Sequence, residues 1–249
     1  MRPVYLALPF LLLAACSNGD MSTMAPRHVP STGLATSDLE GTFSVRGERG
    51  NDRLSATAFF TNKKTGDLVY LADGDAVYVD GQALASKFTF DILAAERSRK
   101  PAGELFVFEL RRGTERISVN VAAIAPIEVT SPVPAADLRL GAPLTVTWSA
   151  RSEATIDAVL MGGCVAVHGR TADSGSLVLD VAQLPNIPDN GKGESTPGYN
   201  PDNPNGDKPC FRDATLSLVR TREDARTTTL ATTRTVAEET HRIPLHLHE

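Results

Sequence analysis

The chain lacks the short motifs that mark the common catalytic and nucleotide-binding sites. It has no Gly-x-Ser-x-Gly, no His-Glu-x-x-His and no Gly-x-x-x-x-Gly-Lys-Ser/Thr sequence, so the usual signatures of hydrolases, metalloproteases and nucleotide-binding proteins are missing. It also lacks an excess of positive charge: 25 Lys and Arg stand against 30 Asp and Glu, and the formal net charge is -5. A nucleic-acid partner is therefore not expected, because such surfaces need concentrated positive charge.

Long hydrophobic runs are scarce as well, and the one at the start of the chain is short. Arg2 precedes an uncharged run over residues 4–15, which ends in Leu13-Ala14-Ala15-Cys16. A membrane-spanning helix needs ~20 apolar residues, whereas a short run that ends in small residues has the layout of an export signal. The segment resembles the precursors of bacterial lipoproteins, whose lipobox has this form.

This resemblance implies that residues 1–15 are a signal peptide and that Cys16 carries a covalent lipid at the start of the mature protein. Ser17, which follows the cysteine, is similar to the pattern that directs lipoproteins to the outer membrane. The expected location is the bacterial cell envelope, on the outer membrane and facing the periplasm or the cell surface. The alternative is an ordinary secretory signal with an incidental cysteine.

The two other cysteines are Cys164 and Cys210. If Cys16 carries lipid, they are the remaining pair, and an exported chain in an oxidising compartment usually joins such a pair. A disulfide closing this loop would stabilise the fold by about 4 kcal/mol in the chain-entropy model. The alternative is two buried free thiols that act as small hydrophobic side chains.

Period-two alternation of apolar residues predicts an all-β fold. After a flexible tether over residues 16–37, rich in small and turn-forming residues, we expect a β domain over residues 38–125 and a second one over residues 126–249. Seven of the nine phenylalanines lie between Phe43 and Phe108, which predicts the first core. The Asp73-Gly74 pair between two apolar runs predicts a hairpin over residues 68–79.

The second segment has a further likeness. Residues 127–132, the alternating Leu144-Thr145-Val146-Thr147-Trp148-Ser149, and the late strand at residues 216–220 resemble immunoglobulin-like β-sandwich modules of bacterial surface proteins. With Cys164 and Cys210, the body resembles uncharacterised proteobacterial lipoproteins that have two such domains. The likeness implies a fold and no reaction, because sandwiches serve many functions.

Four groups of residues could form a metal, catalytic or binding site, and each also has a simpler structural interpretation. The loop over residues 185–209 offers acidic side chains to calcium, but its spacing fails the EF-hand pattern, and a long loop is also a candidate partner surface. The terminal histidines could bind zinc, although a strand with its histidines in solvent is favoured. The aspartates near two Asp-Gly turns could be a glycosidase pair or simply turn residues. The basic cluster is a solvated loop or a contact for anionic lipid or polysaccharide. The residues of these four groups are, in order, Asp189, Asp202 and Asp207; His241, His246 and His248; Asp73, Asp75 and Asp80; and Arg97, Arg99 and Lys100.

We therefore expect no enzyme, no metal and no cofactor beyond the covalent lipid on Cys16. The expected function is binding or structural support by an envelope lipoprotein held on the membrane by its lipid, with an envelope protein or a polysaccharide as partner. Two alternatives remain open. One is a carbohydrate-active hydrolase of the envelope, and the other is an accessory subunit of an envelope assembly complex.

Overall fold

The chain folds almost entirely into strands. The structure, a computed structural model, describes residues 27–87, 92–139, 142–150, 154–162, 165–181 and 213–248. Helical structure is limited to 3-10 turns in these residues, such as η1 (Thr36–Asp38), and no helix among them is long and apolar enough to cross a membrane. The predicted all-β sandwich fold is confirmed.

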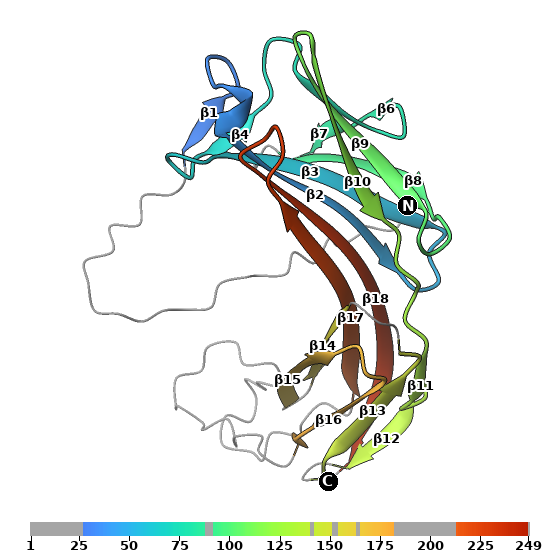
Figure 1. Cartoon of the computed structure of the whole chain (residues 1–249). Coiled ribbons are helices and arrows are strands. Elements are labelled where there is room, and N and C mark those ends of the chain that lie inside the picture. Colours follow the sequence, from blue (N-terminus) through green and yellow to red (C-terminus); the bar gives the residue numbers. More distant parts are fainter. Residues whose placement is uncertain are drawn as a thin grey trace, which may run out of the picture.

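The described strands form three sheets (Figure 1). Sheet A is formed by β1 (His28–Pro30), β2 (Leu39–Glu48), β3 (Arg53–Asn62), β4 (Leu68–Tyr70), β7 (Ala85–Lys87), β8 (Ile92–Ser98), β12 (Ala136–Arg139), β14 (Thr155–Gly162), β15 (Val165–Ala172), β17 (Asp213–Arg226) and β18 (Thr232–His248). Sheet B is formed by β5 (Ala76–Val79), β6 (Gln82–Ala83), β9 (Leu105–Arg112) and β10 (Glu115–Ala122). Sheet C is formed by β11 (Val129–Ser131), β13 (Leu144–Trp148) and β16 (Ser176–Leu179).

Each small sheet encloses one hydrophobic core against part of sheet A. In the first core, Phe43 meets Phe60 and Phe108 edge to face, with ring centroids 5.7 Å and 5.4 Å apart. The second core gathers around Trp148 and Ile156. The alternating residues of β2, β3, β9, β10 and β17 point into these cores as the sequence predicts. Two sandwiches therefore share one large sheet.

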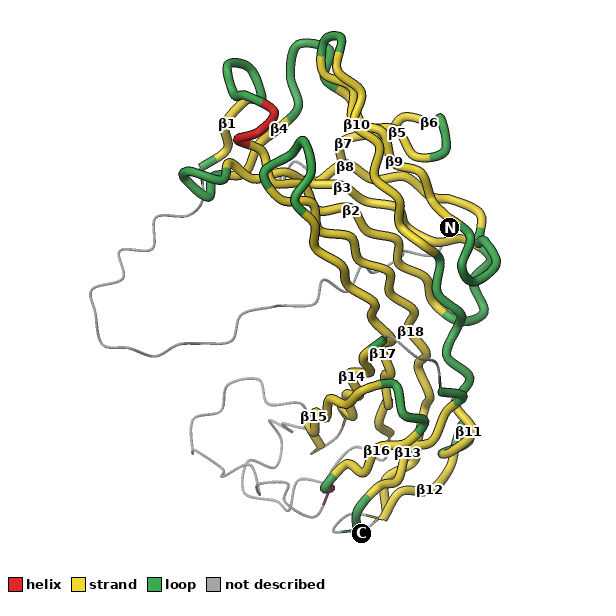
Figure 2. The backbone as a smooth tube through the Cα atoms, in the orientation of Figure 1, coloured by secondary structure: helices red, strands yellow, loops and turns green. Residues whose placement is uncertain are grey.

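The hairpin of β17 and β18 is the part that both sandwiches share. β18 pairs in parallel with β2 over residues 232–240 and with β12 over residues 245–248. Ala237 lies in the first core, and Ile243 and Leu245 lie in the second. Because residues an even number apart point to the same face of a strand, sheets B and C cover the same face of sheet A (Figure 2).

Two expected boundaries change. The limits 38–125 and 126–249 do not separate the two cores, because Leu230 and Ala237 from the second segment lie in the first core. The expected tether over residues 16–37 also ends early. β1 pairs with β4, and Ser31 is fully buried, so residues 28–37 belong to the fold.

The hairpin expected over residues 68–79 is wrong. Val69 on β4 pairs with Phe60 in sheet A, whereas Val77 on β5 pairs with Leu110 in sheet B. The Asp73-Gly74 pair does take positive φ angles, 54° and 84°, but this turn leads from one sheet to the other. The second Asp-Gly pair, Asp80-Gly81, has φ angles of 49° and 78° and connects the paired strands β5 and β6.

The tip of the long hairpin closes the first core. Leu230 is fully buried among the first-core residues, and the next residue, Ala231, donates its N–H to the carbonyl of Leu39 at 2.8 Å. The packing is tight here, since a Cβ on Gly41 would lie 3.0 Å from Leu230 Cδ1. The far end of a hairpin whose base lies in the second sandwich thus completes the first.

Leu230→Ala should therefore destabilise the protein by about 2–5 kcal/mol, because it leaves a cavity in a packed core. Urea unfolding followed by Trp148 fluorescence and by circular dichroism measures the loss. The exposed neighbour Thr229 provides the control, since Thr229→Ala should change stability by no more than about 0.5 kcal/mol. Equal effects of the two substitutions would show that the tip does not contribute to the core.

Candidate functional site: the charged junction between the sandwiches

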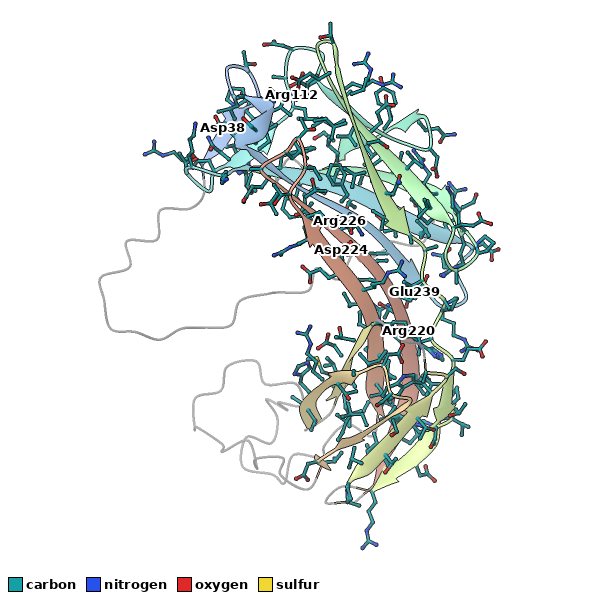
Figure 3. All side chains as sticks on the ribbon, in the orientation of Figure 1. Asp38, Arg112, Arg220, Asp224, Arg226 and Glu239 are labelled. Atoms are coloured by element: carbon teal, nitrogen blue, oxygen red, sulfur yellow. The ribbon has the colours of Figure 1, made fainter. Side chains whose placement is uncertain are left out.

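A buried arginine lies where the two sandwiches meet. On β17, Ala214, Leu216 and Leu218 point into the second core, and the next inward position is Arg220, which is 1% exposed. Figure 3 shows Arg220 and Glu239 in the middle of the long hairpin. A charge is buried at this depth only when its hydrogen bonds are satisfied.

Every hydrogen-bonding group of the Arg220 guanidinium has a partner. Nε donates to Asp173 Oδ2 at 2.7 Å, and Nη2 donates to the Ser149 carbonyl at 2.6 Å. Nη1 donates to the carbonyls of Ala125 and Pro126 at 3.0 Å and 3.1 Å. Asp173 Oδ1 in turn accepts a 2.6 Å hydrogen bond from Trp148 Nε1. Arg220 therefore locks a loop, a strand end and a linker together.

The linker between the sandwiches is held by arginines along its length. Residues 123–128 follow β10 and precede β11, and they lie in no strand. Besides the two bonds from Arg220, Arg222 donates to the Ala122 carbonyl at 2.6 Å and Arg49 donates to the Ile127 carbonyl at 2.9 Å. Two arginines of β17 and Arg49, in the turn after β2, thus satisfy carbonyls that a sheet would otherwise pair, and they fix the linker to the shared sheet.

A second ion pair lies beside the first. Glu239 on β18 is directly opposite Arg220 in the strand register and is 3% exposed. It forms an ion pair with Arg99, which also donates to the carbonyls of Glu48 and Asn51 at 2.9 Å and 3.1 Å. The close approach needs a glycine at position 47, because a Cβ there would lie 2.5 Å from Glu239 Oε1.

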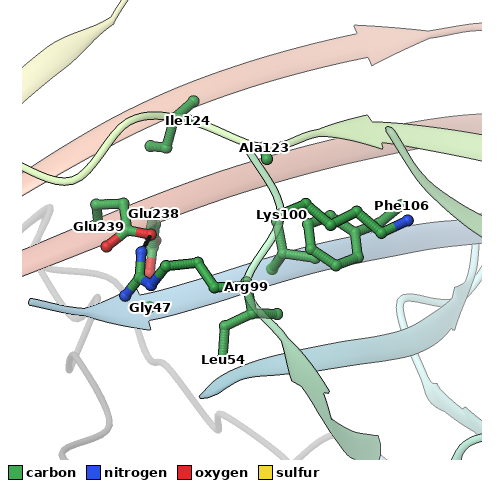
Figure 4. Close-up of a pocket in the computed structure, with 10 residues that line it drawn as sticks. Gly47, Leu54, Arg99, Lys100, Phe106, Ala123, Ile124, Glu238 and Glu239 are labelled. Carbon is green, nitrogen blue, oxygen red and sulfur yellow. Dashed lines mark hydrogen bonds and ion pairs between the residues drawn. The ribbon is translucent and has the colours of Figure 1, made fainter. Parts of the chain in front are cut away.

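Burial has the largest effect on the pKa of the carboxylate in this pair. Burial raises the pKa of Glu239, and the hydrogen bond and charge of Arg99, with the charge of Arg220, oppose the rise. The second oxygen, Oε2, is buried and has no hydrogen-bond partner among the described residues. A small pocket opens beside it, lined by Gly47, Leu54 and Phe106 with the stems of Arg99 and Lys100 (Figure 4). The Arg99–Glu239 pair thus holds β18 to the end of β8 in the first sandwich.

The histidines near the end of the chain lie on the last strand, β18. His246 faces solvent and lies 3.0 Å from Asp213, as expected for the solvent face of the last strand. His241 lies on the inward parity near the junction, where burial and the charge of Arg49 lower its pKa. No group of three or more His, Cys, Asp or Glu side chains could hold a metal in the part of the chain that the structure describes.

The three aspartates of the Asp-Gly turns are engaged in the fold. Asp73 accepts a 2.7 Å hydrogen bond from Thr32. Asp75 accepts from Ser31 at 2.8 Å and from Arg112 Nε at 2.9 Å. These contacts hold the turn from sheet A to sheet B in place, which is the role that turn chemistry favours.

The basic cluster at residues 97–100 is not a free solvated loop. Arg99 pairs with buried Glu239, and Lys100 donates to Asp80 at 2.8 Å and to the Leu105 carbonyl at 2.6 Å, with its ammonium 4.6 Å from the Phe106 ring. Arg97 donates to the carbonyl of Gln82 at 3.2 Å. Tertiary contacts inside the first sandwich therefore account for all three residues.

Other expected sites lie outside the described residues. These are Cys16, Cys164, Cys210 and the loop over residues 185–209 with its three aspartates.

Comparison with known proteins gives no family for this chain. No family model matches, and no curated protein matches. Several solved structures are similar at low identity, and the following three are among them. The Yersinia pseudotuberculosis adhesin InvE is 12% identical with a TM-score of 0.23, over 87% of this chain and 62% of that one. The I9–I11 tandem from titin is 9% identical with a TM-score of 0.24, and the match covers 82% of this chain and 66% of that one. The fibronectin(III)-like modules of Clostridium thermocellum CbhA are 10% identical with a TM-score of 0.24, and the match covers 82% of this chain and 94% of that one. The chain spans less than two thirds of the InvE and titin chains.

Arg220→Met should destabilise the protein by about 3–5 kcal/mol, because it leaves Asp173 as a buried charge without its cation. Chemical unfolding measures the change. Arg226, which pairs with Asp224 on the surface, is the matched control on the same strand, and Arg226→Met should cost less than about 1 kcal/mol. A stability of Arg220→Met within 1 kcal/mol of the parent would contradict a locking role.

The stability effect of Glu239→Gln should depend on pH. Because burial raises the pKa of Glu239 above its ordinary value of 4.5, the folded state binds this proton more tightly than the unfolded state does. The parent therefore loses stability as pH rises from 4.5 through the raised pKa, while the glutamine does not titrate.

Unfolding free energies of both proteins between about pH 4 and pH 7 test this expectation. The difference, variant minus parent, should rise across that window and then become constant. Glu238, whose pKa burial also raises, is present in both proteins and cancels. A difference that stays flat or falls with rising pH would contradict the burial of a charged Glu239.

Proposed function

We propose that this protein is a lipid-anchored lipoprotein of the bacterial envelope that acts as a stiff two-sandwich arm, with a binding or structural role. The observation that carries the proposal is the shared β17–β18 hairpin together with the arginine-held linker. Two sandwiches on a flexible linker would change their relative orientation freely, whereas a continuous sheet and a bonded linker oppose such motion. Stiffness of this kind suits a protein that holds a partner at a set distance from a membrane.

The anchor rests on the lipobox Leu13-Ala14-Ala15-Cys16. Processing would leave Cys16 at the new N-terminus with its lipid, a short distance in sequence before β1 begins at His28. The proposed location is the outer membrane, because Ser17 follows the lipobox cysteine as in lipoproteins sorted to that membrane. Several acyl chains hold a protein stably on a bilayer, while a single chain binds only marginally.

A non-catalytic role is favoured over a carbohydrate-active hydrolase. A glycosidase needs two carboxylates facing the same cleft. The candidate carboxylates Asp73, Asp75 and Asp80 are instead bound to Thr32, to Ser31 and Arg112, and to Lys100. The proposed partners are the membrane and an envelope protein or polysaccharide.

Cys16→Ala should abolish the attachment of lipid and release the protein from the membrane fraction. Labelling with radioactive palmitate and flotation of membranes measure the two effects. Cys210→Ala is the matched control, since it should keep both the label and the membrane location. If Cys164 and Cys210 form a disulfide, that control should also lose about 2–5 kcal/mol of stability. Palmitate label that persists in Cys16→Ala would contradict the proposed anchor.

A further inference from the structure

Strand β10 is a long edge of sheet B. It pairs with β9 over its whole length, from Glu115 opposite Arg112 to Ala122 opposite Leu105, without a shift in register. Among the described strands none pairs with its other side. The side chains of Arg116, Ser118 and Asn120 are exposed along it.

The direction of the free backbone groups follows from the turn that joins β9 to β10. Two residues, Gly113 and Thr114, connect the strands, and Gly113 has a φ of 53°. The flanking residues of such a turn form a hydrogen-bonded pair, so the odd-numbered residues of β10 bond to β9 and the even-numbered ones present N–H and C=O outward. Two contacts agree with this parity. Ala123 donates to the Glu104 carbonyl on the β9 side, and the Ala122 carbonyl accepts from Arg222 on the other.

This edge is less protected than the upper edge of β17. Natural sheets protect exposed edges with charges, proline, bulges or short strands. The upper part of β17, beyond its pairing with β14, has Glu223, Asp224 and Arg226, which form ion pairs with one another or with Arg234. The middle of β10 has neither proline nor bulge, and its outward-bonding residues include a single charge, Arg116.

We propose that β10 pairs antiparallel with β10 of a second copy of this chain, about a two-fold axis at Ser118. In this register Arg116 lies opposite Asn120 of the second copy, and Ser118 lies opposite Ser118. All of these positions have outward N–H and C=O groups, so each pair exchanges two backbone hydrogen bonds.

The proposed register avoids like-charge contacts and continues the buried face of the sheet. Arg116 faces an amide and never another arginine, so no like charges oppose each other across the pair. On the inner face Ile117 lies beside Val119 of the second copy, and both are buried core residues. The contact is isologous, and closed two-fold dimers are the commonest oligomers. It joins two copies of sheet B into one sheet.

One eight-residue strand is a small contact. It buries less than the ~1,600 Å² of a standard interface, so we expect a weak dimer with a dissociation constant in the micromolar range. The pairing does not depend on lipid at Cys16, and its failure would leave the proposed anchor untouched.

The test is sedimentation of the full chain in density-matched detergent over a range of concentrations. Ser118→Pro removes an N–H that points outward, and proline is tolerated at such edge positions because no bond to β9 is lost. It should weaken dimerisation about tenfold or more, while Ser118→Ala, which keeps the N–H, should leave it nearly unchanged. An unfolding curve for each variant confirms that the monomer is folded.

A charge swap tests the register itself. Asn120→Asp places a carboxylate opposite Arg116 twice in the dimer and should tighten it about twofold to tenfold, whereas Asn120→Lys should weaken it by a similar factor. The proposal is overturned by a monomer at all concentrations, by a dimer that Ser118→Pro leaves intact, or by equal effects of the two charges. Protected amides at residues 116, 118 and 120 in a monomer would also overturn it, since another strand would then occupy the edge.

Discussion

The orientation of the two sandwiches depends on the bonds of Arg220. A buried guanidinium recovers the free energy of leaving water only if its donors are all paired with good geometry. Here its partners come from three separate segments: the carboxylate of Asp173, the carbonyl of Ser149 and the linker carbonyls of Ala125 and Pro126. Moving either sandwich would break several of these bonds together, so the linker has one stable position on the shared sheet.

The same charges set the register of the long hairpin. Arg220 and Glu239 are opposite each other and both point inward, where Asp173 and Arg99 balance them. A slip of one residue would turn Arg220 to the outer face and would move the apolar set of β17 out of the second core. A slip of two would separate Arg220 from Glu239. Buried ion pairs stabilise less than apolar packing of equal volume, and this pair instead selects a single alignment of a strand pair that serves two cores.

Much of the fold could be predicted from the sequence, because side-chain alternation is a local property. The inward sets of β2, β3, β9, β10 and β17 are correct for that reason. The hairpin predicted at Asp73-Gly74 is wrong because a tight turn has the same sequence whether the next strand returns to its own sheet or crosses to the other. Here the crossing is fixed by contacts of Asp75 with Ser31 and Arg112, which are distant in sequence. Arg220 was visible as a charge at an inward position after Leu216 and Leu218. Its partners were not, since Asp173 and Ala125 lie 47 and 95 positions away in sequence.

The stiff junction and the free edge of β10 would act together if both proposals hold. If Cys16 carries the proposed lipid, the first sandwich, where β1 lies beside β4, would be the one nearer the membrane. β10 belongs to the same sandwich, and pairing there would join two copies close to their anchors. Because Arg220, Arg222 and Arg49 fix the linker, the second sandwich of each copy would then project in a direction set by the dimer. A flexible junction would lose that direction, which gives a physical reason for burying so many charges at one point of a β protein.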